Sequence, residues 1–231
     1  MITDWLAFWD NPHFIYVSAR HKDVHYRLVA KDIAALVPGP DGRVLDYGSG
    51  EALHADHVAD TAGELLLCEA AASVRAGLEK RFAGNPKIRV VAPHEIAGLP
   101  ERSLDLIVMH SVAQYVTPTG AGVLFALFHR ILKPDGLLVV SDVIQPQTGA
   151  ATDALILLRF GLANGFFFAA LWGLTRTLLS DYWRLRSHLG LTRYAPAAII
   201  DKLNAAGFTA ERAPANIGHN QKRLTFYARP R

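Results

Sequence analysis

The stretch VLDYGSGEA, residues 44–52, places an acid and two glycines directly after an apolar run. Gly48 and Gly50 can adopt backbone conformations that other residues avoid, and they let a ligand approach the main chain closely. Asp46 ends the apolar run. Glu69 follows 19 positions after Gly50, where a carboxylate can accept hydrogen bonds from both hydroxyls of a ribose. These residue types at this spacing predict a site for a cofactor that contains a nucleoside.

The residues that follow Gly48 indicate which nucleoside is bound. A dinucleotide fingerprint has a third glycine at the sixth position, so that a helix N-terminus can approach a pyrophosphate. The six residues here are GSGEAL, with Glu51 where the pyrophosphate would lie and Leu53 in place of the third glycine. The pattern therefore disfavours a nicotinamide-dependent oxidoreductase. It favours a cofactor whose end at this point is zwitterionic, such as the methionine part of S-adenosylmethionine.

Short apolar runs alternate with segments of helical length, and the alternation predicts an open, doubly wound α/β sheet. The runs are nearly continuous in hydrophobicity, which is typical of strands buried on both faces of a parallel sheet. We expect strands at 43–47, 64–69, 88–92, 104–110 and 137–144. We expect helices at 52–60, 71–82 and 121–132, the last closed by the sequence KPDG.

From residue 43 to about 144 the chain resembles the class I S-adenosylmethionine-dependent methyltransferases, and it does so more loosely near its end. VLDYGSG is similar to the first motif of that family, and CEA is similar to its ribose-binding motif. EIAGLPERSLDLIVMHSVAQYV is similar to the segment in which an acid, LP and a strand follow one another. The resemblance implies a mostly parallel, seven-stranded, Rossmann-like sheet with an antiparallel last strand.

The resemblance also implies which residues hold the cofactor. Glu95 falls where the family usually has an acid near the adenine amino group, and Ile96 would supply a backbone N–H to the ring. The complete set expected to bind S-adenosylmethionine is Asp46, Tyr47, Gly48, Gly50, Glu69, Ala70, Glu95, Ile96 and His110.

Candidate catalytic residues follow from the position of ligands in open α/β sheets, which lie beyond the carboxyl ends of the strands. His110 follows the fourth predicted strand, Tyr115 comes shortly after it, and Asp142 lies near the end of the fifth. His110 has the intrinsic pKa of a general base. A role limited to hydrogen bonds near the methionine part of the cofactor remains an equal alternative for His110.

We interpret the chain as one domain, 1–231, in four parts. These are an N-terminal helical lid (1–38), a cofactor-binding core (39–147), a helical cap inserted after the fifth strand (148–194), and a closing helix and strand pair (195–231). The insertion is strongly apolar and carries no charge from residue 160 to 174, but this stretch of 15 residues is shorter than the roughly 20 needed to span a bilayer.

The insertion also provides the main indication of substrate class. Its arginines, at 159, 176, 184, 186 and 193, outnumber its two acids, Asp153 and Asp181. Three roles remain open: a cap over an apolar pocket, a homodimer interface, or a peripheral contact of residues 154–186 with anionic lipid. We expect a small, apolar or lipid-like acceptor. A non-catalytic cofactor-binding or scaffold protein with the same fold remains an alternative.

Composition excludes other classes of function. A net charge of +3 and the lack of a long basic run argue against nucleic acid as a partner. The single cysteine, Cys68, lies in an apolar run and is expected to be a buried thiol in a reducing compartment, so we expect a cytoplasmic protein, with membrane association left open by the insertion.

No metal site is expected, because HEIAG at residue 94 lacks the second histidine of a zinc motif. His21 and His25, one helical turn apart, are interpreted as part of a solvated helix face. The polar cluster GHNQKR, which contains His219 and Arg223, is interpreted as a turn.

Overall fold

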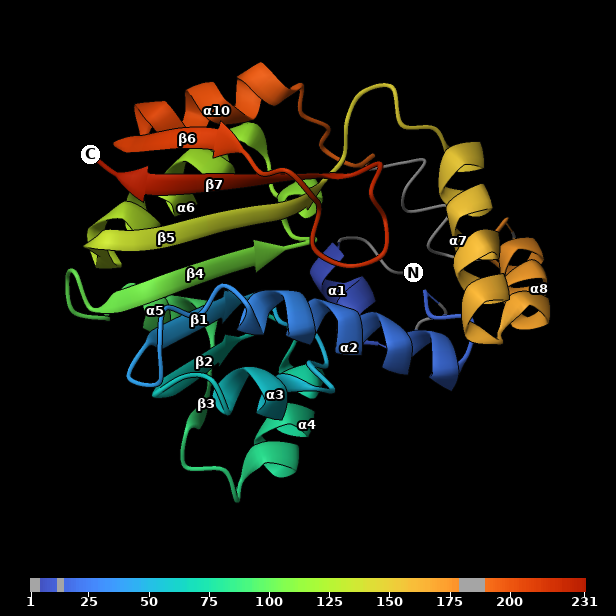
Figure 1. Ribbon diagram of the computed structural model, residues 1–231, viewed down its shortest axis with the longest axis horizontal. Coiled ribbons are helices and arrows are strands. Elements are labelled where there is room, and N and C mark those ends of the chain that lie inside the picture. Colours follow the sequence, from blue (N-terminus) through green and yellow to red (C-terminus); the bar gives the residue numbers. More distant parts are fainter. Residues whose placement is uncertain (1–4, 12–14, 179–189) are drawn as a thin grey trace.

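The computed structural model describes residues 5–11, 15–178 and 190–231. In this part of the chain, seven strands form one sheet in the order β3-β2-β1-β4-β5-β7-β6 (Figure 1). The first five are parallel, and β7 is antiparallel to both of its neighbours. The predicted doubly wound, mostly parallel sheet with an antiparallel last strand is confirmed.

The strands follow the apolar runs closely. Two of the five predicted strands have the predicted bounds, and two others end one residue earlier. The strands are β1 (Arg43–Tyr47), β2 (Glu64–Cys68), β3 (Ile88–Val91), β4 (Leu104–His110), β5 (Leu132–Val143), β6 (Phe208–Arg212) and β7 (Leu224–Pro230).

The fifth strand corrects one prediction. It begins at Leu132 and not at residue 137, so KPDG does not separate a helix from a strand. The sequence lies inside the strand, where the pairing with β4 changes register between Leu104 and Leu106. This irregularity accommodates Pro134, which has no N–H to donate to the ladder. The preceding helix ends one residue before the strand begins.

Helices cover both faces of the sheet (Figure 1). Side chains of α2, α3 and α4 pack on one face, and those of α6 and α10 pack on the other. The helices are α1 (Trp5–Trp9), α2 (Ala19–Ala34), α3 (Ala55–Ala59), α4 (Ala72–Phe82), α5 (Pro93–Ile96), α6 (Pro118–Ile131), α7 (Ala150–Asn164), α8 (Phe167–Leu178) and α10 (Pro196–Ala205), with a 3-10 turn, η1 (Ala113–Tyr115). Helix α3 is shorter than the predicted 52–60.

Alternate residues of the central strands serve the two faces, which explains why the runs are continuously apolar. Leu45 and Ile107 pack under α6, whereas Val44 and Val108 pack under α2 and α3, and all four are fully buried. Cys68 is buried in the same core as expected.

Three elements lie at the carboxyl ends of the parallel strands. Helix α1 and the start of α2 come from the N-terminus, and α7 with α8 forms a helical hairpin beyond the ends of β4 and β5 (Figure 1). Helix α7 packs on α2 through Phe160 and Val24. Among the described residues, no helix combines the length and the hydropathy needed to cross a bilayer. Arg184, Arg186 and Asp181 of the insertion lie outside the described residues.

Candidate cofactor and acceptor site

The turn after β1 is shaped by its two glycines. Gly48 and Gly50 have φ of 78° and 57°, in the left-handed region that residues with a side chain rarely adopt. The N–H groups of Gly48 and Ser49 both donate to the Cys68 carbonyl oxygen, at 2.7 and 3.1 Å. The turn is thereby bent over the end of β2.

Space also requires glycine at both positions. A Cβ on Gly48 would lie 2.3 Å from Val112 Cγ2, and one on Gly50 would lie 2.6 Å from the Tyr26 hydroxyl. That hydroxyl accepts the Glu51 N–H at 2.9 Å. Helix α2 therefore holds the turn from the side opposite the sheet.

Glu69 connects the turn to the end of β2. Its Oε2 accepts the Gly50 N–H and its Oε1 accepts the Ala71 N–H, both at 2.9 Å, and the residue is buried. A carboxylate offers about four acceptor positions, so about two remain for a ligand. Ala70, which follows, is exposed, and its carbonyl accepts from Arg75 Nη1 at 2.6 Å.

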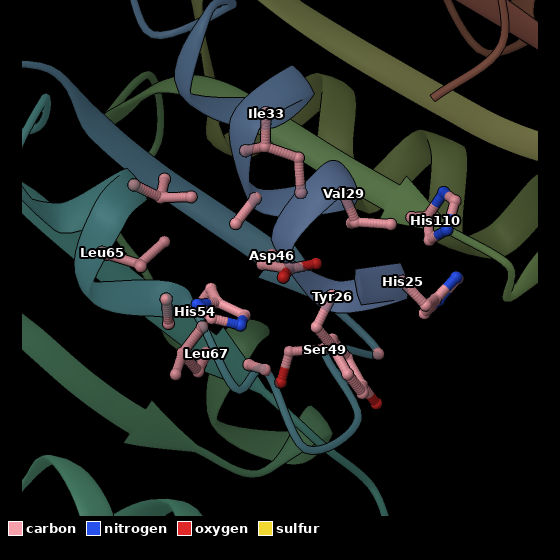
Figure 2. A pocket seen from close by; sticks show the side chains of 15 residues that line it. His25, Tyr26, Val29, Ile33, Asp46, Ser49, His54, Leu65, Leu67 and His110 are labelled. Atoms are coloured by element: carbon pink, nitrogen blue, oxygen red, sulfur yellow. The ribbon is translucent and has the colours of Figure 1, made fainter. Parts of the chain in front are cut away.

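Asp46 faces a small pocket of about 40 Å³ between α2 and the sheet (Figure 2). Val29 and Ile33 of α2 and Leu65 and Leu67 of β2 line the same pocket. Burial in these apolar surroundings, with a smaller effect from the charge of Glu69, raises the pKa of Asp46 to about 7.

A larger cavity of about 490 Å³ runs across the carboxyl ends of four adjacent strands. One lining residue can be taken from each: Glu69 after β2, Gly48 after β1, His110 at the end of β4 and Asp142 in β5. Because neighbouring strands lie about 4.8 Å apart, the cavity extends over roughly 14 Å. It has the size and the place expected of a ligand site in an open α/β sheet.

The N-terminus forms one wall of this cavity. The Trp5 and Trp9 rings of α1 pack on the Tyr115 ring, with centroids 4.8 and 5.6 Å apart, and all three line the cavity. Asp10 ties this segment to the start of α4, because its Oδ1 accepts the Ser73 N–H at 2.7 Å. Tyr47 also lines the cavity and packs edge-on against Phe128.

Four histidines that line the cavity lie close together. The ring centroids of His21, His25 and His219 lie 5.9 to 6.5 Å from one another, and His110 is 6.1 Å from His25. Burial lowers the pKa of each, that of His21 to about 4. They are therefore neutral at pH 7.

This cluster corrects two predictions. His21 and His25 do not lie on a solvated helix face, because α7 and the loop before β7 cover that side of α2: His21 stacks on Phe166 at 5.0 Å, and His219 stacks on Phe160 at 3.9 Å. GHNQKR is more than a turn, because it brings His219 and Arg223 to the cavity. The helical spacing of His21 and His25 was the only signal in the sequence that could have indicated half of the cluster.

His110 is oriented by a neighbouring strand. Its Nδ1 lies 3.0 Å from the Ser141 hydroxyl of β5, and its Nε2 is buried without a hydrogen-bond partner. Asp142, the next residue in β5, accepts a hydrogen bond of 2.6 Å from Ser111 Oγ, and its charge opposes part of the fall in the pKa of His110.

Buried polar atoms without partners gather at this cavity. Four such side-chain atoms are found in the described part of the chain, and three belong to residues that line the cavity: His110 Nε2, Gln114 Oε1 and Arg223 Nε. The Arg223 guanidinium also pairs with Asp153 of α7 at 2.9 Å. Since buried polar groups normally have partners, these atoms indicate a site for a polar ligand group.

Three expected cofactor residues do not line the large cavity: Asp46, which faces the small pocket, Glu95 and Ile96. Glu95 is exposed, and its carboxylate accepts the Ala92 N–H at 2.6 Å, at the start of α5. Ile96 is fully buried in the core. Neither lines the cavity, whereas Pro93 of the same short helix does. Within the described ranges, no group of three or more histidine, cysteine or acidic side chains could hold a metal ion.

Comparison with known proteins supports the same interpretation of the fold. Residues 45–140 match a sequence family described as "Methyltransferase domain". None of the curated proteins matches the chain at a significant level.

Solved structures match the whole chain at low sequence identity. A chain from the complex of the Haloferax volcanii Trm112 methyltransferase activator with a methyltransferase has 14% identity and a TM-score of 0.61, covering 100% of this chain and 99% of its own. The magnesium protoporphyrin IX methyltransferase of Synechocystis PCC 6803, with bound S-adenosylhomocysteine, has 16% identity and a TM-score of 0.60, covering 97% and 92%. DhpI in complex with S-adenosylhomocysteine has 14% identity and a TM-score of 0.60, covering 97% and 94%.

The sheet order, the glycine turn and the matched domain all indicate a methyltransferase fold. Residues 45–140 therefore match a methyltransferase domain, and the whole chain has the fold of solved methyltransferase structures.

Proposed function

We propose that the protein transfers the methyl group of S-adenosylmethionine to a hydroxyl oxygen of a small apolar acceptor. One observation carries the proposal: a single cavity joins the glycine turn and Glu69 to His110, whose Nε2 is buried and has no partner. Cofactor and acceptor would then lie side by side above the sheet.

The residues at the β2 end fit the cofactor. Glu69 keeps free acceptor positions for the ribose hydroxyls, and Gly48 of the turn lines the cavity beside it. Tyr47, Gly50 and Ala70 complete this end. For Glu95 we retain only a supporting role, in fixing α5 beside the adenine position through its bond to Ala92.

When bound, S-adenosylmethionine supplies an electrophilic methyl group on a sulfonium. The acceptor oxygen must lose its proton as the new bond to carbon forms, and neutral His110 takes that proton on Nε2. Ser141 fixes the ring through Nδ1, and the Asp142 carboxylate stabilises the imidazolium that results. Tyr115 positions the acceptor against the wall formed by Trp5 and Trp9.

The acceptor end of the cavity suits a largely apolar molecule. Besides the neutral histidines, its lining includes Ile15, Val116, Ile144, Leu157 and Leu191. Arg223 adds no net charge, since Asp153 neutralises it. A neutral hydroxyl compound is therefore favoured over a charged one.

Titration calorimetry with S-adenosylmethionine, S-adenosylhomocysteine and NADH tests the cofactor first. We expect the two adenosyl compounds to bind in the micromolar range and NADH not to bind. Turnover is then followed as release of S-adenosylhomocysteine with apolar phenols and alcohols, beside amines of matched size. Binding without turnover of any hydroxyl compound would favour the non-catalytic alternative, and methylation of the amines alone would overturn the role of His110 as base.

A further inference from the structure

The hairpin α7–α8 is rich in apolar residues but is buried on one side only. On the inner side, Phe160, Phe166 and Ala170 pack with Val24 of α2. On the outer side, Leu162, Phe168 and Trp172 are 72%, 83% and 67% exposed. Neighbouring exposed apolar side chains of this size are typical of an interaction surface.

The exposed residues form continuous stripes. Leu155, Arg159 and Leu162 follow one another at helical spacing on α7, and Phe168, Leu171, Trp172 and Arg176 do so on α8. Of the seven large apolar side chains that are exposed in the described part of the chain, five belong to these stripes. We call the seven stripe residues the hairpin face.

The hairpin is a built element. Gly165 ends α7 in the left-handed conformation with φ of 75°, and the Phe166 N–H donates to the Gly161 carbonyl at 2.8 Å. A Cβ on Gly161 would lie 3.1 Å from Phe167 Cα, so the two helices pack closely. Asp153, paired with Arg223, fastens α7 to the core. The outer residues are thereby held at fixed positions.

We infer that the hairpin face docks on the surface of an anionic lipid bilayer. Arg159 of α7 gives this face a positive charge, and the one acid of α7, Asp153, is engaged with Arg223. Anionic headgroups provide the matching charge, and Phe168 and Trp172 are side chains that suit the boundary between headgroups and acyl chains.

A second copy of the chain is a poorer occupant of this face. In a two-fold dimer the same patch meets itself, so Arg159 of each copy would be buried against a face whose own seven residues include no acid. A bilayer carries the opposite charge and imposes no such symmetry.

Docking here would place the acceptor site beside the lipid. Leu157 of α7 lines the cavity, so the hairpin has the cavity on one side and the hairpin face on the other. This step rests on the proposed function: the apolar hydroxyl acceptor is drawn from the bilayer.

Co-sedimentation with vesicles tests the docking. Vesicles of phosphatidylglycerol and phosphatidylcholine are compared with phosphatidylcholine alone at low salt, using the full chain, the double variant F168S/W172S, the variant R159Q and the control V123S. Val123 is 67% exposed on α6, away from the hairpin. All replaced side chains are exposed, so the variants should fold, which thermal melts would verify.

We expect binding to the anionic vesicles, a decrease of at least about tenfold in the partition coefficient for F168S/W172S, and a decrease of about fivefold for R159Q. V123S should behave as the parent protein. Lack of binding by the parent, or an equal loss in V123S, would overturn the inference. So would a dimer in sedimentation velocity that F168S/W172S abolishes, because the occupant would then be a second copy.

Titration of the same proteins with S-adenosylhomocysteine separates this inference from the proposed function. Cofactor binding without vesicle binding would remove the docking alone. Vesicle binding without cofactor binding would remove the proposed function and leave the docking in place.

Discussion

Replacing Glu69 by glutamine tests the ribose end of the site. The substitution keeps the size of the side chain and one oxygen acceptor, so a hydrogen bond to Gly50 or Ala71 can persist. What is lost is the negative charge and the second acceptor oxygen, which a ribose hydroxyl would need. A hydrogen bond to a charged group contributes about 1.5 to 3 kcal/mol. We therefore expect S-adenosylhomocysteine to bind about 10 to 150 times more weakly.

Titration calorimetry measures this difference, and Glu64→Gln provides a matched control. Glu64 is the first residue of β2, at the end of the strand opposite Glu69, where it pairs with Arg43 at 2.7 Å. Its replacement should leave the dissociation constant unchanged. A Glu69→Gln protein that is folded and binds within twofold of the parent would refute the assignment of the ribose to this carboxylate.

Three further predictions concern catalysis, pH and the glycine turn. His110→Gln should lower kcat about 10²- to 10⁴-fold with little change in S-adenosylhomocysteine affinity. In the parent protein, kcat should fall with decreasing pH only below the usual histidine pKa, because burial lowers the pKa of His110. Equal activity of the variant would contradict the assignment of His110 as general base. Asp46→Asn should stabilise the cofactor-free protein by more than about 1 kcal/mol above pH 7 and should have no effect near pH 4. The reason is that the pKa of Asp46, about 7 in the folded state, makes its ionisation unfavourable there. Denaturant unfolding at both pH values measures the difference, and an equal gain in stability at both would refute the prediction. Gly48→Ala should lower stability by about 1 to 3 kcal/mol through the clash with Val112. Adding Val112→Ala should recover only part of the loss, because the φ of 78° at residue 48 remains unfavourable for alanine. Full recovery in thermal melts would show that backbone strain makes no contribution.

The sheet and the glycine turn after β1 were predictable because both depend on residues close together in sequence. The apolar run from Leu104 to His110 predicts the strand β4 because its residues are buried. Gly48 and Gly50 predict a turn because both can adopt positive φ. In both cases the signal comes from neighbouring residues. The early start of β5 was not predictable. A proline usually ends a strand, but here the change of register opposite Leu104 and Leu106 accommodates Pro134 inside β5.

The acceptor end depends on contacts between distant segments, and the sequence carries little trace of them. His21, His110 and His219 lie far apart along the chain and meet only when α2, β4 and the loop before β7 are assembled. A helical N-terminal lid was predicted, but the sequence did not indicate that the tryptophans of α1 form a wall of the cavity. Glu95, assigned by resemblance, caps its own helix because a backbone N–H is within reach.

The cavity is assembled from two sources along the chain. Its glycine turn, Glu69 and His110 fall within the matched residues 45–140, whereas Trp5, His21, Leu157 and Arg223 fall before or after them. On the proposed function, changes near Trp5, Leu157 or Arg223 would act on the acceptor, whereas changes in α2 would also reach the glycine turn through Tyr26. On the same proposal, exchanging the segments around Trp5, Leu157 and Arg223 between relatives would change which acceptor is methylated while the matched residues 45–140 stay the same.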